Sequence, residues 1–245
     1  MTDLGPDPTA DPAADGAAAA EPSGAEPAAA ELPAPGGDAS RNETIAGAVM
    51  VGLVLLAALW FRARPAPVFL DTWGVSFVHP DLTNPWWRHL TDLKSVSVLV
   101  AGSILAAVAV VARDRWRAVA CLIAPILAVL LTEYFLKPTV ARHYDGVISF
   151  PSGTTTAVSA LAMAWVVAVP GRLRPAVAVL GAFLVGLECL AVVGLQWHYP
   201  TDAIGGAVFG AGVVLLVDGA LHLSMGSERR RRVRDRPPVD GATAP

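Results

Sequence analysis

Charged residues are scarce in this chain of 245 residues. They make up only 16% of it, whereas hydrophobic residues make up 54%; an average soluble domain has about 25% charged residues. The net charge of −3 argues against a nucleic-acid-binding module, and the composition does not fit a collagen, a disordered chain or a disulfide scaffold. The composition therefore indicates an integral membrane protein with one bundle.

Cysteine and the common cofactor motifs are also lacking. Cys121 and Cys189 both lie inside apolar runs, which excludes a disulfide framework or a metal cage. The sequence contains no glycine-rich nucleotide loop, no cluster of metal ligands and no Gly-x-Ser-x-Gly turn. We therefore expect no metal and no other cofactor.

Basic residues are missing from residues 1–40, which contain eight Asp or Glu residues and recurrent Ala and Pro. Neither helical nor strand periodicity is present, so this segment is predicted to be a disordered acidic tail. A secretory signal is not expected, because no basic start is followed by an apolar stretch.

Six apolar segments of 18 to 22 residues follow the tail. About 20 residues of helix cross the hydrocarbon core of a bilayer, and backbone hydrogen bonding in lipid requires each span to be helical. The sequence therefore predicts an all-α bundle of six transmembrane helices over 41–227 and an Arg-rich tail over 228–245. The segments are 44–61, 95–112, 118–136, 152–169, 176–197 and 203–224.

Arginine indicates the orientation of the bundle. With six spans, the Arg-containing turns at 113–117 and 172–174 lie on the same side as the C-terminal tail, and the positive-inside rule makes this side cytoplasmic. Both termini are then cytoplasmic, although Arg62 and Arg64 fall on the outer side. The tail is interpreted as a topology determinant; binding of nucleic acid or anionic lipid is the alternative. Arg outnumbers Lys sixteen to two and Ala is abundant, which suggests a GC-rich bacterial gene and hence the plasma membrane.

The predicted external loop, 62–94, is rich in Pro and Trp. Tryptophan at a membrane boundary is usually an interfacial anchor. A lid over a substrate entrance is the alternative for this loop.

Three polar stretches, 137–142, 150–154 and 198–202, fall at helix ends on the external face under this topology. In the first, Lys137 and Arg142 suit an anion, because a guanidinium can bind two phosphate oxygens at once. Two alternatives are interfacial snorkelling and, for Lys137, a salt bridge to Glu133 one turn earlier.

The second stretch contains Pro151, Ser152 and Gly153 at a helix start. Ser152 is predicted to be the N-cap, and the first-turn N–H groups attract phosphate. Gly153 permits close approach of a ligand to the backbone. The alternative is an ordinary capped helix.

The third stretch contains His198 and Asp202, with Pro200 predicted to start the last span. Asp202 is expected to face back toward His198. A carboxylate on one ring nitrogen fixes the tautomer and leaves the other nitrogen as a nucleophile. An interfacial His beside an Asp helix cap is the alternative.

Together these stretches resemble the type 2 phosphatidic acid phosphatase superfamily over residues 41–227. The family motifs are Lys-x6-Arg-Pro, Pro-Ser-Gly-His and Ser-Arg-x5-His-x3-Asp. The resemblance implies an acid phosphatase–haloperoxidase-like helical bundle that acts on lipid phosphates or diphosphates. It further implies an external active site, a phosphohistidine intermediate and no metal.

The resemblance assigns roles residue by residue. His198 matches the nucleophile and Asp202 matches its orienting partner. The matched phosphate-binding residues are Lys137, Arg142, Ser152, Gly153 and Thr154, although Arg142 lies five residues after Lys137 and Tyr144 holds the usual Arg position.

Two family residues are replaced. Thr154 replaces the His of the second motif, which in the family protonates the leaving oxygen. Val192 replaces the Arg of the third motif. General acid catalysis contributes about 10²–10⁴-fold in rate. His143 is one hypothesis for a substitute acid; a leaving group that needs little protonation, such as a phosphate, is another.

Two main functional hypotheses follow. The first is a phosphatase that hydrolyses a lipid phosphate or diphosphate through His198. The second is a catalytically weakened relative that binds lipid phosphates or serves in a membrane complex. A third hypothesis is a purely structural membrane protein, in which case the three motif remnants occur together by chance.

Overall fold

The computed structural model describes residues 37–78, 88–89, 91–92 and 95–234. The chain divides into two units, Met1–Pro33 and Ala34–Pro245, and every described residue belongs to the second. The predicted acidic tail lies outside the described residues except for 37–40, which form the first turn of α1 (Gly37–Ala63) instead of tail. Residues 228–234 of the predicted Arg-rich tail are helical as well, because α9 (Pro200–Arg234) continues through them.

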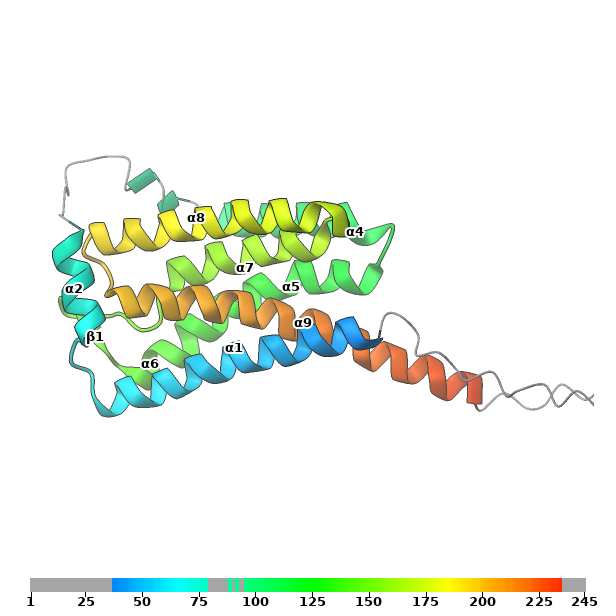
Figure 1. Ribbon diagram of the computed structural model, residues 1–245, viewed down its shortest axis with the longest axis horizontal. Coiled ribbons are helices and arrows are strands. Elements are labelled where there is room, and N and C mark those ends of the chain that lie inside the picture. Colours follow the sequence, from blue (N-terminus) through cyan, green and yellow to red (C-terminus); the bar gives the residue numbers. More distant parts are fainter. Residues whose placement is uncertain (1–36, 79–87, 90, 93–94, 235–245) are drawn as a thin grey trace, which may run out of the picture. The chain divides into compact units, whose positions relative to one another are not determined.

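Each predicted apolar segment coincides with helix over most of its length (Figure 1). Helices over Asp38–Ala63, Arg115–Val140, Gly171–Gly194 and Pro200–Ser227 are long and apolar enough to cross a membrane. Two shorter helices, α4 (Val96–Val111) and α7 (Gly153–Ala168), are apolar but only 16 residues long. The described part of the chain is thus mostly helical with four candidate membrane spans, which agrees with an all-α membrane protein. The remaining long helices are α5 (Arg115–Leu131) and α8 (Arg174–Gly194).

Short elements occupy the end of the bundle at which α9 begins (Figure 1). α2 (Phe69–Phe77) lies in the predicted external loop. A π-helical turn, η2 (Thr132–Leu136), and α6 (Lys137–Val140) continue α5. β1 (His143–Tyr144) and β2 (Val147–Ile148) then form an antiparallel hairpin in which His143 lies opposite Ile148. At the other end, η3 (Gly171–Leu173) precedes α8.

Side-chain caps mark the beginnings of α5 and α7, and a proline begins α9. Asp114 caps α5 by accepting hydrogen bonds from the N–H groups of Trp116 and Arg117. Ser152 caps α7 by accepting from Thr155 N–H, which confirms the predicted N-cap. Pro200 is the first residue of α9, also as predicted.

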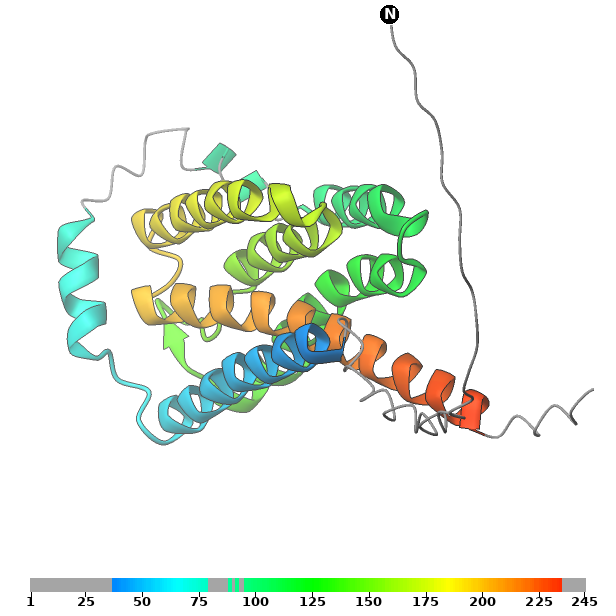
Figure 2. The ribbon, with the colours of Figure 1, turned by 45° about the vertical axis from the view of Figure 1, so that its right-hand side comes forward.

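Small residues let α9 approach its neighbours closely (Figure 2). A Cβ on Gly210 would overlap the Thr156 carbonyl oxygen of α7, and one on Gly47 would overlap the Leu216 backbone nitrogen. Such contacts are typical of membrane helices, which associate through backbone proximity and packing. α7 lies mostly buried between α9, α8, α5 and α4. The packing therefore holds the N-terminal turns of α7 and α9 beside each other.

Large apolar side chains face outward on the surrounding helices. Leu56 of α1, Leu105 of α4 and Phe183 of α8 are 65%, 58% and 60% exposed, respectively. Exposed large apolar side chains on the helices of a bundle are what a membrane-facing surface requires.

Candidate functional site

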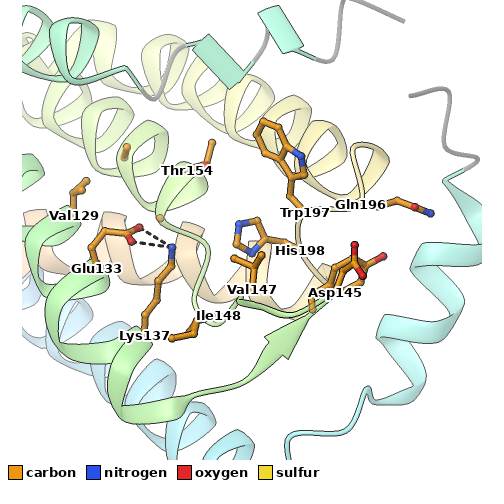
Figure 3. Close-up of a pocket in the computed structure, with 13 residues that line it drawn as sticks. Val129, Glu133, Lys137, Asp145, Val147, Ile148, Thr154, Gln196, Trp197 and His198 are labelled. Atoms are coloured by element: carbon orange, nitrogen blue, oxygen red, sulfur yellow. Dashed lines mark hydrogen bonds and ion pairs between the residues drawn. The ribbon is translucent and has the colours of Figure 1, made fainter. Parts of the chain in front are cut away.

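A pocket of about 480 Å³ lies where α5, η2 and α6 meet the hairpin and the starts of α7 and α9 (Figure 3). It brings together Lys137, Gly153, Thr154 and His198, which come from all three polar stretches. Its other lining residues are Val129, Glu133, Tyr144, Asp145, Val147, Ile148, Ala157, Gln196 and Trp197.

The imidazole of His198 is held by a backbone group. Its Nδ1 lies 2.9 Å from the carbonyl oxygen of Ser149. A carbonyl oxygen only accepts hydrogen bonds, so Nδ1 carries the hydrogen and Nε2 of the neutral ring carries the lone pair. This is the tautomer that a nucleophilic Nε2 requires. The carbonyl of Ser149 thus has the position on Nδ1 that was predicted for Asp202.

The Asp202 carboxylate hydrogen-bonds to Arg142 and to the Tyr199 N–H, two contacts that the sequence did not predict. One of its oxygens lies 2.6 Å from Nη1 of Arg142, and the other accepts from the Tyr199 N–H at 3.0 Å. The carboxylate is fully buried. Asp202 therefore caps the start of α9 and pairs with Arg142.

Arg142 is also fully buried. Besides Asp202, its guanidinium donates to Asp71 at 2.6 Å, to Thr201 at 2.8 Å and to the Pro65 carbonyl at 3.2 Å. It is sandwiched between the rings of Phe61 and Tyr199, 4.0 and 4.5 Å from their centroids. The structure thus places the predicted phosphate clamp in an internal ion-pair network beside the pocket, where its donors are used to join segments of the protein.

Asp71 completes this network and was not predicted from the sequence. Its oxygens accept from Arg142, from Thr201 through both hydroxyl and N–H, and from the Val68 N–H. Burial opposes its charge, but the hydrogen bonds from Thr201, Val68 and Arg142 outweigh burial and lower the pKa of Asp71 below its ordinary value. No motif surrounds Asp71, so only the folded chain reveals this partner.

Lys137 is paired with Glu133 in the pocket. The Lys137 ammonium lies 2.8 and 2.9 Å from the two carboxylate oxygens (Figure 3). This contact confirms the alternative interpretation of Lys137 as the partner of Glu133. A Cβ on Gly153 would overlap Glu133 Oε1 and lie 3.5 Å from Lys137 Nζ. Both charged groups therefore lie directly against the first turn of α7, and a larger residue at 153 would require the Glu133 side chain to move.

The N–H and hydroxyl groups of Ser152 are both hydrogen-bonded within the protein. The N–H donates to the Asp202 carbonyl at 2.9 Å, and the hydroxyl accepts from Thr155 at 3.4 Å. The first-turn groups at the pocket wall belong instead to Gly153 and Thr154. These are the N1 and N2 positions, whose N–H groups have no acceptor within an α-helix.

The remaining predicted positions lie away from the pocket lining. His143 is exposed on β1, and it is the following residues, Tyr144 and Asp145, that line the pocket. Val192, at the position where the resembled motif has Arg, is fully buried and packs with Val193 and Ala203. Among the described residues, no group of three or more His, Cys, Asp or Glu side chains is arranged to hold a metal ion.

Comparison with known proteins returned no matching family model, no matching curated protein and no matching solved structure. Function is therefore inferred from the chemistry of the pocket itself.

Proposed function

We propose that this protein is a membrane-embedded phosphatase that hydrolyses lipid phosphates or diphosphates through a phosphohistidine at His198. One observation carries the proposal: His198, with its Nδ1 hydrogen directed to Ser149, shares a pocket with Lys137 and the first turn of α7. A tautomer-fixed imidazole, an ammonium and a helix N-terminus are together suited to phosphoryl transfer.

The proposed reaction has two steps. The phosphate binds the Lys137 ammonium and the N–H groups of Gly153 and Thr154. Nε2 of His198 then attacks phosphorus, the bond to the leaving oxygen breaks, and a phosphohistidine forms. Water subsequently attacks phosphorus, which releases inorganic phosphate and regenerates the imidazole.

The Arg142 network has a positioning role in this proposal. It joins the loop after α1, α2, the residue before the hairpin and the first turn of α9 through contacts of 2.6 to 3.2 Å. The hairpin is followed by Ser149, and the first turn of α9 is preceded by His198. Holding these two segments together keeps the Ser149 carbonyl on Nδ1.

A lipid substrate agrees with the surroundings of the pocket. Val129, Ala157 and Trp197 contribute apolar lining, and the outer helices carry exposed large hydrophobic side chains. We propose that all six apolar helices, including the shorter α4 and α7, cross the plasma membrane as in the type 2 phosphatidic acid phosphatase superfamily, with the pocket on the extracytoplasmic side and both termini in the cytoplasm. A phosphate group at the membrane surface then reaches the helix ends while its chain stays in lipid.

Phosphate release from purified protein in detergent tests the proposal. Phosphatidic acid, a polyprenyl diphosphate and a glycolipid phosphate serve as substrates, and acid-labile, base-stable phosphoprotein is trapped in parallel. We expect His198→Ala to abolish both release and the phosphoprotein. His143→Ala, a substitution of an exposed histidine in the same region, is expected to behave as wild type. Release by His198→Ala at the wild-type rate would overturn the mechanism.

The second candidate is a protein that binds lipid phosphates without hydrolysing them. Thr154 cannot supply a proton at neutral pH, Val192 is a buried apolar residue, and Arg142 is engaged in the fold. Saturable binding of phosphatidic acid vesicles, without phosphate release and with no effect of His198→Ala, would favour this candidate.

A further inference from the structure

Glu133 is a carboxylate at the centre of the proposed phosphate site. It lines the pocket, both of its oxygens contact Lys137, and Oε1 packs against Gly153. Its side chain is 39% exposed, so a ligand in the pocket can reach it. In Figure 3, Glu133 and Lys137 lie on one side of His198, while Asp145 and Gln196 lie on the other.

The position of Glu133 is unexpected for a residue that only pairs with Lys137. A phosphate bound by Lys137 and by the first turn of α7 would lie next to the Glu133 carboxylate, and two anions at that distance repel each other. The repulsion disappears when a proton is shared between them.

Resting on the proposed phosphatase function, we propose that Glu133 is the general acid–base catalyst of this site. As the bond from Nε2 of His198 to phosphorus forms, the bond to the ester oxygen breaks, and protonated Glu133 gives its proton to that oxygen. The carboxylate then takes a proton from the water that attacks phosphorus. The nitrogen–phosphorus bond breaks, phosphate leaves, and Glu133 is again protonated for the next substrate.

The other titratable groups fit this role less well. Among the described residues that line the pocket they are Lys137, Tyr144, Asp145 and His198. Lys137 binds the phosphate and His198 is the nucleophile. Asp145 lies on the opposite side of His198 from Lys137 (Figure 3), whereas the leaving oxygen departs on the side of the phosphate opposite the attacking nitrogen. Tyr144 packs edge-on against Tyr199, with ring centroids 4.5 Å apart.

The proposal also identifies a substrate class. An alkoxide is a poor leaving group and requires a proton, whereas a phosphate leaves a diphosphate without one. A site that contains its own acid is suited to alkyl phosphate monoesters. Glu133 thus fills, from a different helix, the role that Thr154 cannot.

The leaving group gives a direct test through Glu133→Gln, which keeps the shape of the side chain but has no carboxyl proton to give. With phosphatidic acid, we expect the rate of phosphoprotein formation to fall by about 10²–10⁴-fold. With p-nitrophenyl phosphate, whose phenolate leaves without a proton, we expect the pre-steady-state burst of nitrophenolate to be retained. The steady-state rate should then fall, because the phosphohistidine is hydrolysed slowly and accumulates.

Asp145→Asn is the matched control, since it neutralises a second carboxylate of the pocket and is expected to change the rates with both substrates by the same factor. Equal losses in the rate of phosphoprotein formation with both substrates in Glu133→Gln, or no loss with either, would overturn the role of Glu133 while leaving His198-dependent hydrolysis intact. An absence of release by wild-type protein from every substrate would overturn the proposed function and this inference together.

Discussion

At the scale of single residues, charge burial organises the end of the bundle that contains the pocket. Arg142, Asp71 and Asp202 are all fully buried, and two ion pairs of 2.6 Å join them. Burying one of these charges without its partners would be strongly unfavourable. The three residues are therefore interdependent, although they lie in three separate parts of the sequence.

The contribution of Asp71 to the stability of this network should depend on pH. Its pKa is lowered in the folded protein, so its contribution to the free energy of unfolding is present above the pKa of an unfolded Asp, about 3.9. That contribution is lost as pH falls through the lowered pKa of the folded state. We expect the thermal unfolding midpoint of the wild type in detergent to fall over this acidic range, and Asp71→Asn to be less stable at neutral pH with a smaller acid-induced decrease.

Asp92→Asn is the control, because the Asp92 side chain is 79% exposed. It should retain the wild-type pH dependence. An Asp71→Asn protein whose unfolding midpoint changes with pH as steeply as that of the wild type would contradict the assigned role.

At the scale of helices, glycine determines which pairs pack closely. α1 and α9 lie in extended contact, and a Cβ on Gly47 would overlap backbone atoms of Gly212 and Leu216. Backbone cannot move aside as a flexible side chain does. Further along the same helix, a Cβ on Gly52 would have no neighbouring atom within 4 Å.

This pair of glycines predicts opposite effects of one substitution. Gly47→Ala is expected to reduce the free energy of unfolding by roughly 1–3 kcal/mol through overpacking. Gly52→Ala should be neutral or stabilising by up to about 1 kcal/mol, because Ala is the better helix former. Unfolding midpoints in detergent distinguish the two, and equal effects would argue against close packing of α1 on α9.

At the scale of the whole molecule, the number of membrane crossings determines the side on which each loop lies. α7 has 16 residues, which is about 24 Å of helix at 1.5 Å per residue, against a hydrocarbon core of about 30 Å. The proposed six-span topology requires α7 to cross nevertheless. Its flanking segments contain Val147 and Leu173, which are 67% and 46% exposed.

Cysteine labelling of intact cells tests this crossing. We expect a membrane-impermeant maleimide to modify Val147→Cys from outside, and Leu173→Cys only after the membrane is permeabilised. The parent protein, with Cys121 and Cys189, measures the background. Modification of both positions from the same side would show that α7 does not cross.

Much of the helical framework was predictable because it depends on local composition. Apolar runs without charge form helices wherever the backbone must satisfy its own hydrogen bonds. The beginnings of α7 and α9 at Ser152 and Pro200 follow from capping chemistry and from the fixed φ of proline, both of which act within a single turn. The four-residue spacing of Glu133 and Lys137 also allowed their salt bridge to be stated as an alternative role for Lys137.

The amino-acid sequence by itself determined which segments are helical and which polar residues lie at helix ends, since these features depend on neighbours along the chain. Only the tertiary structure decided the partners of those residues: the Ser149 carbonyl on His198, Asp71 on Arg142, and Glu133 against Gly153. The physical reason is that buried charges and ring nitrogens take whichever donor or acceptor the packing brings within hydrogen-bond distance, and a backbone carbonyl has no signature in the sequence.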